Sequence, residues 1–422
     1  MRFVNSVDGS VYGIVGPGQK PPSRMALKGL KYPRHTVFLS RLVEVVFFPI
    51  AAFIRKAARN HEVKRILIVE PFNLGDVISL AIMFDPLHRR FPKAEIHLLT
   101  KSLGNEIYRE DPRVTEIHAV EFPWAKRGRK WDPRTLNLHA LFQLIRKLRK
   151  ASFDIGIDTR GDIRTQILMV LLGCKVRVGY TNYLCSNVVT LGLLLTHNAG
   201  QLKATQRFLI NLEVIRQLGC AIADYHPHPL LPLRNTGQQN TFTVLCHPGA
   251  GWKFRLWQCD RWIALINKIV RHYDVGVRVI GEQSEGPHLV DIRKGVSQAV
   301  DFKITTLVDL VSEIRTADLI LCLDSGPMHI AAAYEKPLIA LFGPGHKDIW
   351  RPYSLSSCII DHQDRYPCSP CLQKRCVLPE ANCMDAITPE EVFEKVSEMI
   401  PDVFRRTSVE DRRCRPMDDL PQ

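Results

Sequence analysis

The residues around Asp324 have the pattern of a phosphate-binding turn. A continuous apolar run precedes Asp324, Ser325 and Gly326, and an alanine-rich segment containing His329 follows them. This order predicts a buried strand, a tight turn and a helix, so backbone N–H groups and the positive end of the helix dipole point outward. Such a turn suits an anion, and His329 would lie within reach of the same ligand. The alternative is an ordinary crossover in which Asp324 and Ser325 only cap the helix.

A second polar position follows the first predicted strand of the chain. Gly75 and Asp76 end the loop after Arg65–Glu70, at the carboxyl edge where open α/β sheets bind ligands. From these residues alone we favour Asp76 as the N-cap of a helix that begins at Val77, because Asp is a frequent cap.

A glycine-rich basic segment, HPGAGWKFRLW (247–257), follows another predicted strand. Gly249 and Gly251 free the backbone to approach a ligand, and Arg255 or Lys253 could bind phosphate. The alternative for Arg255 is a surface charge beside a helix start. After the next strand come Glu282 and Glu285, which are possible ligand-binding or helix-capping acids.

Three ordered segments resemble glycosyltransferase family 9, the ADP-heptose:lipopolysaccharide heptosyltransferases. The resemblance extends from about Lys64 to Ile400. It implies an α/β protein of the GT-B fold, with two Rossmann-like domains facing across a cleft. It also implies metal-independent transfer of heptose from ADP-heptose with inversion. The segments are RILIVEPFNLGDVISLAIMFDPLHRRFPKAEIHLLT (65–100), HPGAGWKFRLWQCDRW (247–262) and DSGPMHIAAAYEKPLIALFGP (324–344).

The resemblance assigns roles to the polar residues. Asp76 matches the aspartate that acts as general base in the family. Arg255 stands where the family usually has a phosphate-binding lysine, so the phosphate ligand is either Arg255 or Lys253. Glu285, or less well Glu282, matches the glutamate that holds the nucleotide ribose. The expected donor-binding residues are therefore Gly75, Gly249, Arg255, Glu285, Asp324, Ser325, Gly326 and His329.

Other kinds of site are disfavoured by spacing. No GxGxxG follows a strand, because GAGWKF lacks the third glycine, and the sequence has neither a Walker A run nor a metal-binding DxD pair. We therefore expect no metal and no cofactor in the reaction. One metal question stays open, because a CxxC spacing begins the group Cys368, Cys371, Cys376 and Cys383.

Strand and helix patterns alternate in two blocks, which predicts doubly wound parallel sheets. The expected parts are a basic extension (1–60), an N-terminal Rossmann-like acceptor domain (61–232), a C-terminal donor domain (233–400) and a charged tail (401–422). His226–Gln239 is the expected linker. The expected strands are Arg65–Glu70, Ala94–Leu99, Asp154–Ile157, Phe242–Cys246, Val275–Ile280, Leu319–Leu323 and Leu338–Phe342, and the expected helices are Asp76–Arg90, Leu136–Arg149, Asp162–Leu172, Asp260–His272, Thr306–Arg315, Met328–Tyr334 and Thr388–Ile400.

Composition fits a globular protein with acidic partners. A chain of 422 residues is too long for a single hydrophobic core, which indicates two domains. A net charge of +14 favours acidic partners, such as a nucleotide-sugar donor, a lipid-linked oligosaccharide acceptor or an anionic membrane surface. We expect no nucleic-acid partner, since no basic–aromatic stripe is present. The 12 cysteines are scattered, many in apolar runs, which indicates reduced thiols rather than disulfides.

The N-terminal extension contains a long apolar segment, TVFLSRLVEVVFFPIAAFI (36–54). It approaches the roughly 20 residues needed to span a bilayer, but Arg41, Glu44 and Pro49 interrupt it. We expect either a basic amphipathic helix on a membrane surface or a helix packed on the N-terminal domain. The first alternative gives a cytoplasmic protein that is peripheral on the inner membrane.

Two classes of function remain after this reasoning. The leading one is an inverting glycosyltransferase with Asp76 as base; another GT-B enzyme, with a different nucleotide sugar or as an epimerase, is an alternative. The other class is a silent scaffold that only binds a nucleotide sugar. Acceptor contacts are expected near Trp124–Trp131 and Arg160–Arg164.

Overall fold

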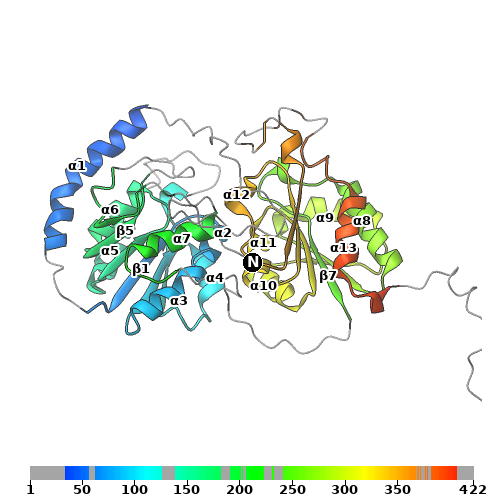
Figure 1. The fold of residues 1–422 in the computed structure, drawn as a ribbon, viewed down its shortest axis with the longest axis horizontal. Coiled ribbons are helices and arrows are strands. Elements are labelled where there is room, and N and C mark those ends of the chain that lie inside the picture. Colours follow the sequence, from blue (N-terminus) through cyan, green and yellow to red (C-terminus); the bar gives the residue numbers. More distant parts are fainter. Residues whose placement is uncertain are drawn as a thin grey trace, which may run out of the picture. The chain divides into compact units, whose positions relative to one another are not determined.

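The computed structural model describes residues 34–56, 62–125, 138–181, 191–200, 202, 206–222, 231, 241–366, 368, 369, 371, 376, 378 and 382–405. The chain divides into two compact units, drawn in Figure 1. Unit 1 comprises Met1–Leu231 with Asp348–Arg351, and unit 2 comprises Pro232–Lys347 with Pro352–Gln422. The expected linker lies almost wholly outside the described residues, as does the charged tail beyond Arg405.

Unit 1 is built on a parallel sheet with the strand order β3-β2-β1-β4-β5-β6. Its central strand β1 is apolar and buried, because helices cover both faces of a doubly wound sheet. After β3 the chain returns to the other side of β1, so the order reverses between β1 and β4. The elements are β1 (Arg65–Glu70), α2 (Leu74–Ile78), α3 (Ala81–Arg90), β2 (Glu95–Thr100), α4 (Ser102–Tyr108), β3 (Glu116–Ala119), η1 (Pro123–Ala125), α5 (Leu138–Lys150), β4 (Ile155–Asp158), α6 (Ile163–Leu171), β5 (Val176–Gly179), β6 (His197–Asn198) and α7 (Arg207–Arg216).

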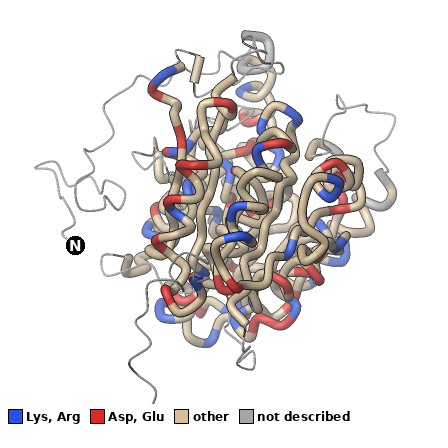
Figure 2. Tube along the Cα trace, turned by 90° about the vertical axis from the view of Figure 1, so that its right-hand side faces the viewer, with Lys and Arg blue, Asp and Glu red and all other residues tan. Residues whose placement is uncertain are grey.

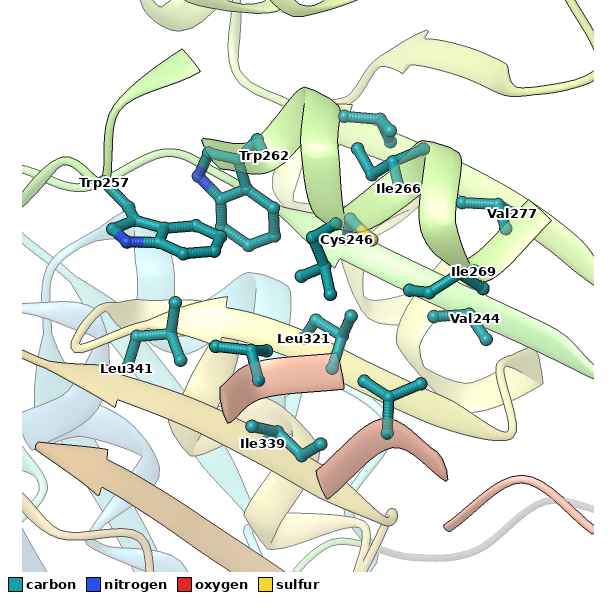
Figure 3. Packing of buried hydrophobic residues seen from close by; sticks show 14 of the residues in the cluster. Val244, Cys246, Trp257, Trp262, Ile266, Ile269, Val277, Leu321, Ile339 and Leu341 are labelled. Atoms are coloured by element: carbon teal, nitrogen blue, oxygen red, sulfur yellow. The ribbon is translucent and has the colours of Figure 1, made fainter. Parts of the chain in front are cut away.

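Unit 2 repeats this plan with the order β12-β11-β10-β7-β8-β9, and its strands are also parallel. The order reverses between β7 and β10. Trp257 and Trp262 pack edge to face in its core, beside apolar residues of β7 and β10 (Figure 3). The elements are β7 (Thr243–His247), η3 (Lys253–Arg255), α8 (Cys259–His272), β8 (Gly276–Gly281), η4 (Gln283–Glu285), α9 (Gly286–Gly295), β9 (Asp301–Ile304), α10 (Leu307–Thr316), β10 (Leu319–Leu323), α11 (Gly326–Ala333), β11 (Leu338–Phe342), α12 (Lys347–Trp350), β12 (Ser357–Asp361), η5 (Gln363–Arg365), α13 (Pro389–Met399) and η6 (Asp402–Phe404).

The expected fold class, α/β with two doubly wound parallel sheets, is confirmed. The prediction of one helix over Asp76–Arg90 is wrong, because the structure has two helices, α2 and α3, that are separated at Ser79 and Leu80. Distant side chains satisfy the polar groups at this break. Tyr108 Oη donates to the carbonyls of Val77 and Ile78, and Asn211 Nδ2 donates to the Ser79 carbonyl.

Helix α1 (Arg34–Lys56) packs on unit 1 along a narrow stripe, beside α6 (Figure 1). Ala51 lies in an apolar cluster with Ile163, Val170 and Leu194, and its carbonyl accepts a hydrogen bond from Arg177 Nη2 at 2.9 Å. The expectation that this helix packs on the N-terminal domain is therefore confirmed for the side of α1 that contains Ala51.

A buried carboxylate fixes the same helix to a loop. Glu44 is fully buried and accepts hydrogen bonds from the backbone N–H groups of Leu191, Gly192 and Leu193. Among the described residues, no helix is long and apolar enough to cross a membrane. Glu44 therefore interrupts the apolar sequence because it has a structural partner, which the sequence pattern alone did not reveal.

We predict that Glu44→Ala lowers the free energy of unfolding by about 1–3 kcal/mol, because three backbone N–H groups lose their buried carboxylate acceptor. Urea unfolding followed by circular dichroism measures the change. The control is Arg41→Ala, which changes an exposed side chain of the same helix. Equal loss of stability in both variants would show that α1 is not anchored through Glu44.

Candidate active site

Asp76 is the centre of a buried charge network at the switch point of unit 1. It follows β1, and its Oδ1 accepts hydrogen bonds from Arg160 Nη1 at 2.6 Å and from Arg207 Nε at 3.2 Å. Arg160 follows the neighbouring strand β4, and Arg207 begins α7. Arg207 also reaches Glu70 Oε2 at 2.9 Å, so two carboxylates face two guanidinium groups. The loop positions at a doubly wound switch point are where ligands bind in such sheets.

Burial and charge oppose each other in this network. Burial raises the pKa of Asp76, but Arg160 and Arg207 outweigh it and bring that pKa below the ordinary value of 3.8. Burial, helped by the negative charge of Asp76, raises the pKa of Glu70 above 4.5. The arginines thus hold Asp76 ionised at neutral pH, although its side chain is only 2% exposed.

The expected N-cap role of Asp76, in a helix that begins at Val77, is wrong, because α2 begins at Leu74 and Asp76 lies inside its first turn. The N-cap residue is Asn73, three positions earlier, and Asp76 Oδ2 accepts the Asn73 N–H at 3.3 Å. This contact is long for a hydrogen bond, and a carboxylate oxygen has room for a second donor. Oδ2 therefore retains acceptor capacity, whereas Oδ1 is taken up by the two arginines. Gly75 precedes it in the first turn and is partly exposed.

In the segments expected to bind the acceptor, several side chains make contacts within unit 1. Arg160 is largely buried against Asp76 and its guanidinium lies 4.6 Å from the Phe72 ring centroid. Arg164 pairs with Asp162 and lies over the Trp124 ring. The rest of the segment 124–131, from residue 126 onward, lies outside the described residues.

In unit 2, Arg255 joins the two loops at the switch point. Its Nη1 lies 3.0 Å from Asp324 Oδ2 and 3.2 Å from the Asp324 carbonyl oxygen. Its Nε is buried and has no hydrogen-bond partner among the described residues. Lys253 is exposed in the same turn. The structure thus directs Arg255, rather than Lys253, toward the turn after β10.

Asp324 is buried beside this arginine. It is 5% exposed, and burial raises its pKa although Arg255 opposes the rise. A Cβ at Gly345 would overlap with Asp324 Oδ2, so glycine at that position is what admits the carboxylate. The loops after β7, β10 and β11 therefore converge on Asp324.

The expected phosphate-binding turn is present at the start of α11. Ser325 is the N-cap residue, and its side chain makes no capping hydrogen bond to the helix; its Oγ donates to the Leu323 carbonyl instead. Gly326 is the first helical residue, and His329 is buried in the first turn. This leaves the N-terminal end of α11 without a side-chain cap.

Glu285 folds back over the loop after β7. Its Oε2 accepts the Glu282 N–H at 2.8 Å, which is a capping contact, and it lies 3.7 Å from His247 Nε2. A Cβ at Gly249 would overlap with the Glu285 carboxylate. Gly249 therefore brings Glu285 to the carboxyl edge of β7, and burial raises the pKa of this carboxyl.

The four C-terminal cysteines line one cavity of about 20 Å³, together with Phe254, Pro344 and Tyr366. Within the described part of the chain, one group of three or more potential ligands has its ligand atoms within 4.8 Å of each other, and it does not include these cysteines. The cavity alone does not make them a metal site.

Sequence reasoning missed Glu70, Arg207 and His247. The sequence pointed to Glu70, because it is the polar last residue of an apolar strand, and to His247, because it begins the segment HPGAGWKFRLW. No sequence pattern pointed to Arg207, because it lies 131 residues from Asp76 in the chain.

Both units are doubly wound parallel sheets, and each has an arginine–aspartate pair at its switch point. Residues 141–382 match the model of glycosyltransferase family 9 (heptosyltransferase). The chain belongs to this family and is a glycosyltransferase, which confirms the expected family. The match includes the motifs at 247–262 and 324–344, whereas the motif at 65–100, with Asp76, lies outside it.

Individual relatives agree with the family match. Lipopolysaccharide heptosyltransferase 3 of Escherichia coli is 25% identical over 295 residues, 66% of this chain and 84% of that protein. Lipooligosaccharide heptosyltransferase 2 of Campylobacter jejuni is 35% identical over 96 residues, 23% of this chain, and the match spans only 30% of that protein. The structure of E. coli heptosyltransferase WaaC with ADP has a TM-score of 0.63 at 16% identity, and the match covers 80% of this chain and 100% of that one, which confirms the fold.

We predict that Asp76→Asn destabilises the protein by about 3 kcal/mol at pH 7, because a buried ion pair loses one partner. Asp76 has a folded-state pKa below 3.8, so its stabilisation is fully present above its unfolded pKa and is lost as the pH falls through the folded value. The difference between wild type and variant should therefore shrink below about pH 4. Urea unfolding across this range measures it, and a difference that grows on acidification would contradict the ionised state.

Proposed function

We propose that this glycosyltransferase moves a heptose from ADP-heptose, with inversion, to a lipopolysaccharide-core-type acceptor. The acceptor hydroxyl attacks the anomeric carbon, the bond from that carbon to the diphosphate oxygen breaks, and Asp76 takes the hydroxyl proton. ADP leaves with the bonding electrons. The observation that supports this most strongly is the conjunction of the family match with an ionised carboxylate at the switch point of unit 1.

The donor site is supported by the arrangement in unit 2. A diphosphate at the uncapped start of α11 would face backbone N–H groups and the positive helix end. Arg255 has a buried Nε–H without a partner among the described residues, and its Nη1 forms an ion pair with Asp324 Oδ2. Arginine in this position neutralises charge as it develops on the leaving ADP. Glu285, held over Gly249, is the proposed ribose ligand.

The base is supported by its charge state rather than by a pKa tuned to neutrality. A general base must be unprotonated, and Arg160 with Arg207 secures this for Asp76. The same arginines lower its proton affinity, which reduces the driving force for proton transfer. We assign the proton to Oδ2, because Oδ1 already accepts from both arginines.

The function is tested with a panel of nucleotide sugars and a heptose-deficient lipopolysaccharide core as acceptor, with mass spectrometry of the product. We expect ADP-heptose to add one heptose. Asp76→Asn, assayed below its unfolding midpoint, should bind ADP nearly as wild type does but lower turnover by about 10²–10⁴-fold. Asp85→Asn, another carboxylate paired with arginine in unit 1, is the control. Near-normal turnover in Asp76→Asn would exclude it as base, and donor binding without transfer would favour a scaffold.

We predict that Arg255→Ala weakens ADP binding about tenfold or more, because a charge-assisted contact to the diphosphate is lost. Arg255→Lys should recover much of the loss, since it retains the charge. Lys253→Ala is the matched control from the same turn and should bind ADP as wild type does. Calorimetry that shows the loss in Lys253→Ala, and none in Arg255→Ala, would assign the phosphate to Lys253.

We also propose that α1 places the enzyme on an anionic membrane surface at the cytoplasmic face of the inner membrane. Its buried or half-buried positions form one stripe at spacings of three and four residues, and the exposed residues between Phe38 and Phe53 are apolar except for Arg41. In Figure 2, basic and acidic residues are interspersed along the described chain. The proposal therefore rests on apolar contact. The exposed apolar residues of α1 are Phe38, Leu39, Leu42, Val45, Val46, Phe48, Ile50 and Phe53.

We predict that the double substitution Val46→Glu and Phe53→Glu reduces binding to anionic vesicles at least tenfold, because burial of such side chains contributes about 1.5–3 kcal/mol each. The matched control is Val290→Glu with Val403→Glu, which charges two exposed apolar positions of unit 2. Cosedimentation measures binding. Equal binding of the two double variants would contradict the membrane role of α1.

A further inference from the structure

A cluster of histidines and glutamates lies on the edge strand β3 of unit 1 and on its neighbour β2, on residues that have no part in the proposed transfer reaction. Glu95 and His97 project from one face of β2, and Glu116 and His118 from the same face of β3, since alternate residues of a strand share a face. The parallel register pairs His97 with Glu116. All four side chains therefore meet at one place on the sheet.

Two separations measured from His97 Nδ1 match those between ligand atoms of a tetrahedral metal site. His97 Nδ1 lies 3.3 Å from His118 Nε2 and 3.6 Å from Glu116 Oε2. The three residues have ligand atoms that all lie within 4.8 Å of one another. Tetrahedral zinc with bonds of about 2.0–2.1 Å places neighbouring ligand atoms about 3.3–3.4 Å apart. The observed separations are close to that length.

Hydrogen bonding accounts less well for the same geometry. The contact between the two rings is 3.3 Å, and the contacts from the rings to Glu116 are 3.4 Å and 3.6 Å, all longer than the usual range. Among the described residues, His97 Nε2 is buried without a hydrogen bond, and a carboxylate oxygen of Glu95 lies 3.5 Å away. An ion shared by His97 Nδ1, His118 and Glu116 would replace the long contacts between these side chains with short ligand bonds.

The two imidazoles are buried, and Glu116 beside them is open to solvent. His97 is 4% exposed and His118 7%, and the Phe153 ring packs edge-on against both. Glu116 is about half exposed, which leaves a path from solvent.

We propose that His97, Glu116 and His118 bind one Zn²⁺ ion, with water as the fourth ligand. Two imidazoles and one carboxylate are a ligand set that zinc accepts. Glu95 would accept the Nε2–H of His97 and so orient the ring, as outer carboxylates do for metal-bound histidines. The ion ties the short edge strand β3 to β2 and stabilises unit 1; it takes no part in sugar transfer.

The test uses full-length protein freed of metal with a chelator and titrated with Zn²⁺. We expect wild type to bind one equivalent more than Glu116→Gln, or to bind at least tenfold more tightly. Saturating Zn²⁺ should raise the melting temperature of wild type by several degrees and leave that of Glu116→Gln unchanged. Glu116 is exposed enough for its substitution to leave the fold intact, and Glu121→Gln, at an exposed site just after β3, is the matched control.

Cobalt distinguishes this site from the cysteines. Co²⁺ bound by histidine and carboxylate gives visible absorption without thiolate charge transfer, and we expect Glu116→Gln and His118→Gln to lose that absorption. Equal stoichiometry and affinity in wild type and Glu116→Gln would overturn the proposal. So would a cobalt spectrum dominated by thiolate charge transfer that both substitutions leave unchanged.

Discussion

An ion pair between the two loops at each switch point is the constraint on which the rest of the structure depends. In unit 1, Asp76 after β1 pairs with Arg160 after β4; in unit 2, Arg255 after β7 pairs with Asp324 after β10. Each pair joins loops that parallel strands bring to the same edge of their sheet. A buried charge without a partner is costly, so each aspartate fixes the position of its arginine and the reverse.

The two pairs suit different chemistry because their surroundings differ. Two arginines donate to Asp76 Oδ1, and one of them also pairs with Glu70. Their positive charges keep Asp76 ionised. Arg255 faces a single carboxylate and keeps a buried N–H without a partner in the described chain. One site can therefore accept a proton and the other can bind an anion, as transfer from a nucleotide sugar requires.

Much of the fold followed from local sequence patterns. The strands Arg65–Glu70, Leu319–Leu323 and Leu338–Phe342 have the predicted bounds, because each contains a continuous apolar run that polar residues, proline or glycine end. The short strands β3 and β5 were missed, since each has only four residues and one of them is charged. The break between α2 and α3 had no local signal, because Tyr108 and Asn211 satisfy its carbonyl groups from distant parts of the chain.

The site was predictable to a similar extent. Asp76, Arg255 and the turn at Asp324 were found because they follow strands or belong to recognisable motifs. Their partners are long-range: Arg207 meets Asp76 across 131 residues, and Asp324 meets Arg255 across 69. Spacing within a motif carries no information about such contacts. The helix α1 was ambiguous for the same reason, since the partners of Glu44 lie almost 150 residues away.

The central claim, that two arginines hold Asp76 ionised as the base, is tested most directly by the pH dependence of kcat/KM for sugar transfer. The account predicts a rate that stays level from about pH 8 down to about pH 5, because the essential carboxylate titrates only below its ordinary value. Circular dichroism over the same range confirms that the protein remains folded. An acid limb with an apparent pKa near 7 would contradict the account, since the base would then be a group other than Asp76 in this network.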